Sequence, residues 1–153
     1  MVVEYHTPVL AREVLQYLLS RQDGIYADCT LGGGGHAEHI LTSLEKKGKL
    51  IGFDQDIEAI SYTRQRLASF SDRIILIHQN FIHLRAELQR YGIRTIDGIL
   101  FDLGVSSHQI NSDIRGFSFQ KDARLDMRMN QSQALDAWTV ISLTPFFSSF
   151  KVS

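Results

Sequence analysis

The sequence predicts an α/β fold of Rossmann type, with about four parallel strands and flanking helices. Two observations lead to this prediction. Short apolar segments suited to strands alternate along residues 24–102 with segments whose apolar residues recur at helical spacing. A run of four glycines, residues 32–35, also follows the first strand segment and opens a helical segment. Strands that alternate with single helices are joined by right-handed crossovers and therefore align in parallel.

A helix is predicted before the first strand, because Leu10, Val14 and Leu18 recur at four-residue spacing and share one helix face. Thr7 and Pro8 suit its N-cap and its first helical position. The elements that follow are, in order, a strand over 24–28, a helix that carries apolar residues 37–44 and stops at Gly48, a strand over 49–54, a helix over 57–67 capped by Asp56, a strand over 74–77, a helix over 84–91 that stops at Gly92, and a strand over 96–102. The strand over 74–77 contains only Ile and Leu, which is typical of a strand buried on both faces.

Composition and charge describe a compact protein without a general affinity for polyanions. The chain has 153 residues, of which 44% are hydrophobic and 22% charged, and this predicts one domain with a substantial core. Its 16 Lys and Arg residues against 17 Asp and Glu residues leave a net charge of -1, so any contact with nucleic acid must come from a local patch. The first ten residues lack the pattern of a signal peptide and no stretch approaches a membrane span, so a cytoplasmic location is expected.

The sequence predicts no metal site. The single cysteine, Cys29, excludes an internal disulfide bond and a multi-cysteine zinc site, and it fits a reducing compartment. His36 and Glu38 form an H-x-E pattern, but the P-C-x-x-C pattern that accompanies it in zinc deaminases is absent, which excludes deamination. For His36 two interpretations stay open: a residue that packs locally at a helix start, or a ligand contact.

Three aspartates, Asp28, Asp54 and Asp102, fall at the ends of predicted strands. Ligands of parallel sheets bind beyond the carboxyl ends of the strands, so these carboxylates are expected to converge where the glycine run also lies. Glycines there let a ligand approach the main chain, although a simple tight turn is the alternative explanation.

The glycine run fits two kinds of cofactor. The spacing Gly32-x-Gly34-x-x-Ala37, with Asp54 twenty residues after Gly34, matches the dinucleotide fingerprint and its ribose-binding acid. The carboxylates of Asp28 and Asp102 would repel a pyrophosphate, whereas they favour S-adenosylmethionine, which carries a sulfonium and an ammonium group and no phosphate. A P-loop is excluded, because no Lys-Ser/Thr pair follows the last glycine.

The segment over 115–129 combines cations with aromatic residues. Its candidate RNA-binding residues are Arg115, Phe117, Lys121, Arg124 and Arg128. Cations hold phosphates and aromatic rings stack on unpaired bases, which is how single-stranded RNA is often bound. The alternative is a solvated loop held by its phenylalanines on the core.

Six blocks of sequence, HTPVL, DCTLGGGGH, LIGFDQD, DGILFDLGVSS, RGFSF and LDMRM, occur in this order between about residues 5 and 133. Together they resemble the RsmH/MraW family of S-adenosylmethionine-dependent methyltransferases, which methylate the exocyclic N4 of a cytidine in bacterial small-subunit (16S) ribosomal RNA. The resemblance implies a Rossmann-like class I methyltransferase sheet, S-adenosylmethionine as cofactor, and the 30S subunit with its rRNA as partner.

The resemblance also implies roles for individual residues. The expected cofactor contacts are Gly34, Gly35 and His36, with Asp54 as the ribose ligand, Phe81 lining the adenine pocket, and Asp102 and Gln109 near the methyl donor. Asp102 is also the expected catalytic residue. Its side chain, or a carbonyl group of the loop behind it, is expected to accept a hydrogen bond from the amine that is methylated and to hold this amine in line with the methyl group.

The chain departs from the family pattern in two ways. Ala123 and Arg124 stand where the family has Gly-Pro, and Asn130 stands in place of an acid. The family also continues through a helical insertion and further strands, whereas residues 134–153 do not align with it beyond a faint Ala-x-x-Trp similarity. The sequence therefore divides into residues 1–133, the N-terminal part of a methyltransferase domain, and residues 134–153, a divergent tail.

The absence of later strands has a physical consequence. The fourth strand becomes a sheet edge with unpaired backbone groups, which tends to aggregate or to pair with a partner. Residues 140–150 are apolar enough to cover this edge, but Pro145 opposes a regular strand there. The chain is expected to keep its cofactor site and to lack much of its RNA-binding surface, which leaves its activity in question. A non-catalytic RNA- or protein-binding remnant of this fold and an NAD-binding enzyme are the alternatives.

Overall fold

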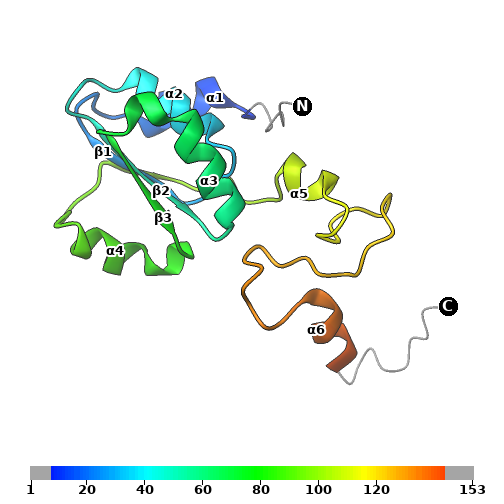
Figure 1. Cartoon of the computed structure of the whole chain (residues 1–153). Helices are drawn as coiled ribbons and strands as arrows, with labels where there is room; N and C mark the ends of the chain where they lie inside the picture. Colours follow the sequence, from blue (N-terminus) through cyan, green and yellow to red (C-terminus); the bar gives the residue numbers. More distant parts are fainter. Residues whose placement is uncertain (1–7, 144–153) are drawn as a thin grey trace. The chain divides into compact units, whose positions relative to one another are not determined.

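The computed structural model describes residues 8–143 of the chain (Figure 1). Contacts between residues divide this part into two compact units, residues 8–104 and residues 105–143. The first unit contains the sheet, and the second consists of two short helices and the coil that joins them.

The sheet of the first unit has four parallel strands, which confirms the Rossmann-type fold and the predicted number of strands. The strands are β1 (Ile25–Asp28), β2 (Lys49–Asp54), β3 (Ile74–His78) and β4 (Gly98–Leu100). They lie in the order β3-β2-β1-β4, so the strand order reverses beside β1. Ligands of such sheets bind at this reversal, outside the carboxyl ends of the strands.

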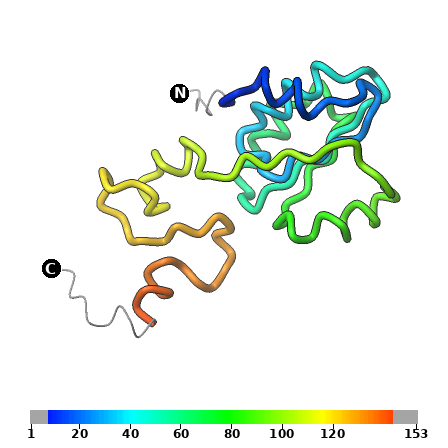
Figure 2. Tube along the Cα trace, turned by 180° about the vertical axis from the view of Figure 1, so that it is seen from behind, coloured from blue at the N-terminus to red at the C-terminus, as the bar shows by residue number. Residues whose placement is uncertain are grey.

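Helices cover both faces of the sheet, as the two opposite views show (Figure 1, Figure 2). On one face lie α1 (Ala11–Leu18), α2 (Gly35–Ser43) and α3 (Ile57–Arg66), and on the other lies α4 (Leu84–Arg90). Two single 3-10 turns, η1 (Ala68–Phe70) and η2 (Phe81–His83), follow α3 and precede α4. The sheet is therefore the middle layer of three.

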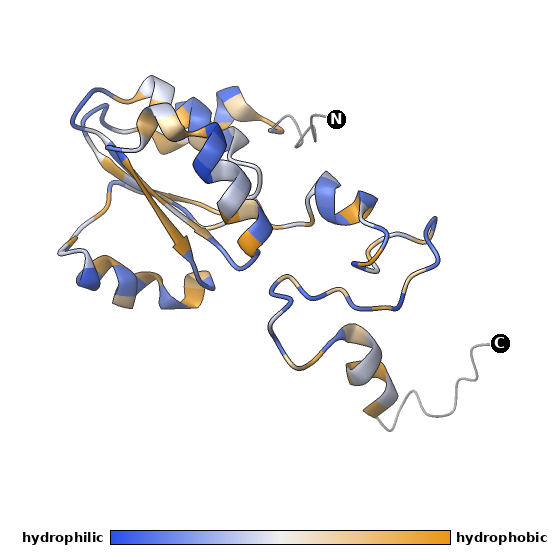
Figure 3. Ribbon diagram, viewed as in Figure 1, coloured by the Kyte–Doolittle hydropathy of each residue, from blue (hydrophilic) through white to orange (hydrophobic). Residues whose placement is uncertain are grey.

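Successive side chains of the strands enter opposite apolar layers. Tyr26 and Leu50 pack with α1, α2 and α3, whereas Ile51 and Phe53 pack on the face that α4 covers. All four are fully buried. Figure 3 shows the result, since the strands carry mainly hydrophobic colours and the helices carry hydrophilic colours on part of their surface.

The first helix begins later than predicted. Leu10 has a left-handed φ of 56° and is the N-cap of α1, so Pro8 precedes the helix instead of occupying its first position, and Thr7 lies outside the described residues. The predicted apolar face is also partly wrong. Leu15 and Leu18 pack against the core, whereas Leu10 is 64% exposed because it lies before the helix.

The second helix ends earlier than predicted, at Ser43. Gly48 does not terminate it but lies in the turn before β2, where a Cβ atom would be 2.7 Å from the carbonyl oxygen of Gln22. Glycine is needed there because two backbone segments approach closely. The predicted cap at Asp56 is confirmed, since its side chain accepts a hydrogen bond of 3.0 Å from the first turn of α3.

The two edges of the sheet also differ from the prediction. β3 is an edge strand whose side chains enter both apolar layers, Ile74 and Leu76 on one face and Ile75 and Ile77 on the other, so the predicted packing on both faces is confirmed. The extent of burial is smaller than expected, because only Ile77 is buried. β4 is shorter than predicted and ends at Leu100. Its predicted position at an edge is confirmed within the described sheet, where Ile99 is 41% exposed and Phe101 49% exposed.

The second unit contains α5 (Ser107–Asn111) and α6 (Ala137–Leu143). The predicted tail begins at residue 134, so α6 lies within it, while residues 144–153, including most of the predicted cover for β4, lie outside the described part. Backbone hydrogen bonds of 2.8 Å from Ala137 to Asp126 and from Trp138 to Leu125 tie α6 to the coil. No helix between residues 8 and 143 is long and apolar enough to cross a membrane.

Candidate functional site

The glycine run forms a loop between β1 and α2 in which two of the glycines adopt left-handed backbone conformations. Gly32 has a φ of 50° and Gly34 a φ of 75°. At Gly34 a Cβ atom would also lie 2.8 Å from the Thr63 side chain, and at Gly35 it would lie 3.0 Å from Pro8. Backbone conformation and close packing therefore both require glycine here, which supports the tight-turn explanation without excluding a ligand on the open side of the loop.

Two side chains of the α3 helix hold this loop by donating hydrogen bonds to carbonyl oxygens of the loop. The Thr63 hydroxyl donates to the Gly32 carbonyl at 2.9 Å, and the Arg66 guanidinium donates to the Gly33 carbonyl at 3.0 Å. Arg66 also forms an ion pair of 2.7 Å with Glu38 on α2. The loop is thus bound to a helix on one side and to the strand ends on the other.

Thr63 and Arg66 were not predicted from the sequence as residues that hold the loop. A signal was present for Thr63, because it falls on the same face of its helix as Ile60 and Leu67, which are apolar. A hydroxyl group in an apolar stripe indicates a buried hydrogen bond. No comparable signal identified Arg66, whose contacts depend on the position of the loop.

The structure brings the three predicted aspartates to one edge of the sheet. Asp28 is the last residue of β1, Asp54 is the last residue of β2, and Asp102 follows β4 by two residues. Since β1 lies between β2 and β4, Asp28 is the central carboxyl group. The negative charges of Asp54 and Asp102 both act to raise its pKa.

Asp28 is buried, with 1% of its surface exposed. Burial is the main reason that its pKa rises from 3.8 to about 7, because a charged carboxylate is poorly solvated there. Its Oδ1 atom accepts hydrogen bonds from the Thr30 amide at 3.0 Å and from the Thr30 hydroxyl at 3.4 Å. Its Oδ2 atom is buried and has no hydrogen-bond partner among the residues that the structure describes.

Asp54 is held by the backbone at both of its carboxylate oxygens. Its Oδ2 atom accepts from the Gly32 amide and its Oδ1 atom from the Asp56 amide, each at 2.8 Å. Burial raises the pKa of Asp54, and these two hydrogen bonds oppose that rise by stabilising the charged form. Each oxygen keeps a further lone pair, so the carboxylate can accept from a diol without losing its backbone contacts.

His36, in the first turn of α2, and Asp102, after β4, lie close to each other. The His36 Nε2 atom lies 3.5 Å from the Asp102 Oδ2 atom, and the two side chains are 9% and 60% exposed. Burial lowers the pKa of His36, while the Asp102 charge acts in the opposite direction. The Nδ1 atom of His36 is the second buried side-chain atom that lacks a hydrogen-bond partner within residues 8–143. The structure thus gives His36 a local contact at Nε2 and leaves the buried Nδ1 atom without a partner in the described part of the chain.

Phe81 lies in η2, the turn that follows β3, and is half-buried. Its ring packs edge to face against Phe101, with 5.3 Å between the ring centroids. Phe101 was missed by sequence analysis, where it was counted as part of the fourth strand. The sequence carried no signal for this role, because only the structure shows that β4 ends at Leu100 and leaves the ring beyond the ladder.

Gln109 belongs to the second unit, where it is 6% exposed. Its side-chain oxygen accepts from the Ser106 amide at 3.0 Å, and this contact completes a capping box at the start of α5. Its side-chain nitrogen donates to the Met129 sulfur atom at 3.3 Å. The side chain thus has a structural role within this unit.

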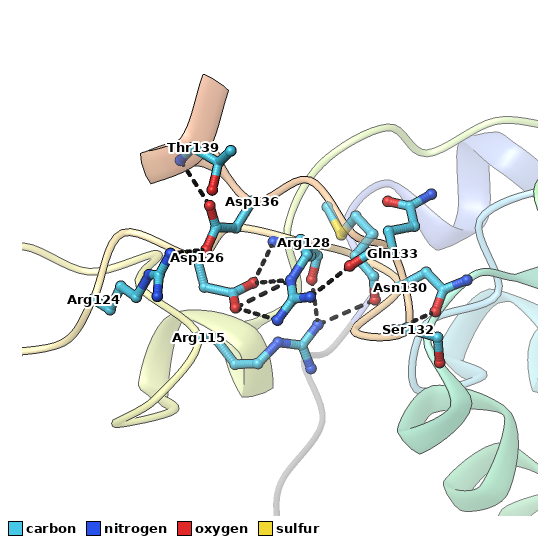
Figure 4. Close-up of polar contacts among 10 residues, drawn as sticks. Arg115, Arg124, Asp126, Arg128, Asn130, Ser132, Gln133, Asp136 and Thr139 are labelled. Carbon is cyan, nitrogen blue, oxygen red and sulfur yellow. Dashed lines mark hydrogen bonds and ion pairs between the residues drawn. The ribbon is translucent and has the colours of Figure 1, made fainter. Parts of the chain in front are cut away.

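The candidate RNA-binding cations also make contacts within the second unit, and several of them appear in Figure 4. Arg115 is only 2% exposed and donates to the carbonyl oxygens of Arg128 and Met129. The others are in ion pairs, which are Arg128 with Asp126, Arg124 with Asp136 and Lys121 with Asp113. Phe117 is half-buried. These contacts hold the loop together internally, most clearly through Arg115. The alternative interpretation, a solvated loop held by its phenylalanines on the core, is wrong for Phe119, whose side chain is fully exposed. RNA binding by this segment stays a prediction.

The site residues of the first unit fit a positively charged cofactor. Three carboxylates meet beside a glycine loop, one of them with its oxygens fixed by backbone amides, and two buried polar atoms on Asp28 and His36 lack protein partners in the described chain. No group of three or more potential metal ligands occurs within the described residues.

A model of the MraW methylase family matches residues 4–146. The chain belongs to the MraW methylase family. Members of this family are S-adenosylmethionine-dependent methyltransferases. The match extends past residue 133, so the part of the predicted tail that contains α6 also belongs to the family domain.

Two curated relatives named ribosomal RNA small subunit methyltransferase H show the extent of the similarity. The protein of Oceanobacillus iheyensis is 49% identical over 137 residues, which cover 90% of this chain and 42% of that protein. The protein of Lactiplantibacillus plantarum is 50% identical over 143 residues, which cover 92% of this chain and 45% of that protein. The chain therefore spans less than half the length of these MraW relatives.

A solved structure supports the fold independently. The crystal structure of a protein from Clostridium thermocellum that is assigned as an rRNA methylase superposes with a TM-score of 0.52 at 21% identity, covering 62% of this chain and 49% of that chain. At this identity the similarity concerns the fold alone. It agrees with the incomplete Rossmann-like methyltransferase sheet predicted from the sequence.

Proposed function

We propose that this MraW family chain binds S-adenosylmethionine at the carboxyl ends of β1, β2 and β4, as the cofactor-binding part of an rRNA (cytosine-N4) methyltransferase. The observation that carries the proposal is the Asp54 carboxylate, whose two oxygens are fixed by backbone amides beside the glycine loop. Such a fixed acceptor suits the two hydroxyl groups of a ribose.

The other contacts follow from the positions of the residues. Gly34, Gly35 and His36 line the loop at the start of α2, and the Phe81 ring, which Phe101 supports edge to face, offers an apolar surface for an adenine. The family resemblance implies that Gln109 contacts the cofactor near the methyl group. This contact would be additional to its structural role in the capping box of α5.

The cofactor supplies a methyl group activated by a positively charged sulfur. Asp102 is the proposed catalytic residue because its side chain is 60% exposed and one of its oxygens lies near His36. It would accept a hydrogen bond from the exocyclic amine and align the nitrogen with the methyl group, which compensates for the weak nucleophilicity of that nitrogen. The carboxylates around it also favour the positive charge of the sulfonium group.

The proposal for the RNA partner rests on the relatives and not on the geometry of the site. The relatives are named as methyltransferases of small-subunit ribosomal RNA, so we infer that the 30S subunit, in the cytoplasm, is the partner of this chain as well. Lys121 and Arg124 are the candidate cations whose side chains stay most exposed, at 43% and 64%. Contacts by Arg115, Phe117 and Arg128 would require the second unit to rearrange.

Calorimetry of the purified chain with S-adenosylmethionine and with NAD tests the cofactor. We expect binding of S-adenosylmethionine and none of NAD. Asp54→Asn should weaken the affinity by about ten- to a hundredfold, since one oxygen becomes an amide donor that faces backbone amides. The matched control is Asp23→Asn, which removes only an exposed ion pair with Arg21. Preferential binding of NAD would overturn the proposal.

A non-catalytic, RNA- or protein-binding role is the second candidate. Transfer of a radiolabelled methyl group to 30S subunits separates the two candidates. Transfer that depends on Asp102 supports the enzyme, whereas cofactor binding without transfer supports the non-catalytic role.

A further inference from the structure

We propose that Thr30 is a positioning residue whose hydroxyl group holds the Asp102 backbone and thereby sets the Asp102 carboxylate against His36. The importance of this role for methyl transfer depends on the function proposed above for Asp102. The positioning itself is a property of the protein without any ligand and can be tested separately.

The first step is the position of Asp102 at the end of an edge strand. The last ladder contact of β4 is the hydrogen bond of 3.0 Å from the Cys29 amide to the Leu100 carbonyl. Beyond Leu100 the chain has left the sheet, and Phe101 and Leu103, on either side of Asp102, are 49% and 71% exposed. The Asp102 backbone therefore needs a contact outside the ladder to keep a defined position.

Thr30 supplies that contact from the loop that follows the neighbouring strand, β1. The Asp102 amide donates a hydrogen bond of 2.7 Å to the Thr30 hydroxyl oxygen. The Thr30 hydroxyl in turn lies 3.4 Å from Asp28 Oδ1, to which it donates, and the Thr30 amide donates to the same oxygen at 3.0 Å. A hydroxyl group can accept and donate at once, which an aliphatic side chain of the same shape cannot.

The chain of contacts ends at the reactive edge of the site. It runs from the buried Asp28 carboxyl through Thr30 to the Asp102 backbone, and the Asp102 side chain then lies 3.5 Å from the His36 ring. Thr30 thus connects the end of β1 with the segment after β4, next to the glycine loop. A shift of Asp102 would change the electrostatic environment of His36 directly.

His36 therefore reports on the position of Asp102. Its pKa is lowered mainly by burial, raised by the charge of Asp102 and lowered by the charge of the neighbouring His39. When the Asp102 carboxylate moves away, the raising contribution is lost and the pKa of His36 falls. A purely structural role of Thr30 in the stability of the fold would leave this titration unchanged.

The experiment is an NMR titration of the His36 ring in the full chain without cofactor, with the signal assigned by its loss in His36→Gln. We expect Thr30→Val to lower the pKa of His36 in the same direction as Asp102→Asn, and the double variant to titrate like Asp102→Asn alone. Thr30→Ser keeps the hydroxyl group and should titrate like the wild type. Thr42→Val is the matched control, because the Thr42 hydroxyl donates to the Glu38 carbonyl within α2.

A wild-type titration curve in folded Thr30→Val would overturn the proposal. Hydrogen exchange of the unaltered protein gives a second test that needs no variant. The Asp102 amide should exchange more slowly than that of Gly104, which lies two residues further along, and equal rates would equally overturn the proposal.

A different result would overturn the function proposed above. If the wild type does not bind S-adenosylmethionine, that function is wrong, but the His36 titration still tests the role of Thr30. When the wild type does bind, we expect Thr30→Val to reduce methyl transfer more than cofactor affinity, and Thr30→Ser to restore the transfer.

Discussion

Asp28 carries a carboxyl group that is buried at the centre of the site and has a pKa of about 7. In the unfolded chain the same group has a pKa near 3.8, so between these two values the folded protein holds a proton that the unfolded chain releases. Folding stability from this group is therefore present at low pH and is lost as the pH rises toward 7. Around neutral pH both protonation states of the group are populated, so the charge of the site depends on pH.

Asp28→Asn isolates this effect. The amide keeps an acceptor for the Thr30 amide and cannot ionise, so the variant should gain stability relative to the wild type by about 2 kcal/mol between pH 5.5 and pH 8. Urea unfolding at the two pH values measures the difference. An equal stability difference at both values would show that the carboxyl group titrates normally.

The residues of the site were predicted unevenly from the sequence. Asp28 and Asp54 follow apolar strand segments directly, so the topology of parallel strands places them at one edge. Thr30 was not identified, because its role arises only when the segment after β4 meets the end of β1. The internal contacts of Arg115 were likewise not predictable, since they go to carbonyl oxygens whose positions depend on the folded coil.

At the scale of elements, the glycine loop is packed against α3 and hydrogen-bonded to it. Gly34 combines a left-handed φ of 75° with a close approach to Thr63. Gly34→Ala should therefore destabilise the protein by about 2 kcal/mol, because the new methyl group both strains the backbone and displaces the Thr63 side chain.

Thermal or urea unfolding measures this loss, with Gly104→Ala as the control. No atom lies within 4 Å of a Cβ placed at Gly104, so this substitution should change stability little. Equal effects of the two substitutions would contradict the requirement for glycine at Gly34.

The coil between α5 and α6 depends on one buried guanidinium group. Arg115→Met leaves the carbonyl oxygens of Arg128 and Met129 without their donor, and we expect a loss of about 1–3 kcal/mol in the stability of the second unit. Limited proteolysis should show faster cleavage within residues 115–130. Arg124→Met, which removes one ion pair from a side chain that is 64% exposed, should cleave at a rate close to that of the wild type.

Element boundaries were less predictable than element types. The strand over residues 49–54 and the cap at Asp56 follow from local sequence, and both are confirmed. The extent of burial of β3 was overestimated, because an apolar run does not show whether a strand lies at the centre or at the edge of its sheet. The predicted start of α1 was wrong because Leu10 adopts a left-handed conformation. This conformation is rare outside glycine, so no signal in the sequence indicated it.

At the scale of the whole molecule, the sheet ends at β4, whose outer edge is partly exposed in the described structure. Ile99 on this strand is 41% exposed, and exposed apolar edges favour pairing between chains. We expect the chain to self-associate as its concentration rises, and Ile99→Lys to reduce this association by placing a charge on the edge.

Analytical ultracentrifugation over a range of concentrations measures the effect. Ile82→Lys is the control, since Ile82 is 73% exposed but lies in η2 and not on the strand. If both substitutions reduce association equally, net charge and not the strand edge is responsible.

The way in which the glycine loop is bound has a thermodynamic consequence for ligand recognition. Thr63 and Arg66 hold two of its carbonyl oxygens, and Asp54 holds the Gly32 amide, before any ligand arrives. A preorganised loop loses little conformational entropy on association, so more of the favourable interaction energy remains as affinity. A run of four glycines is normally flexible, but in this protein these hydrogen bonds fix its conformation.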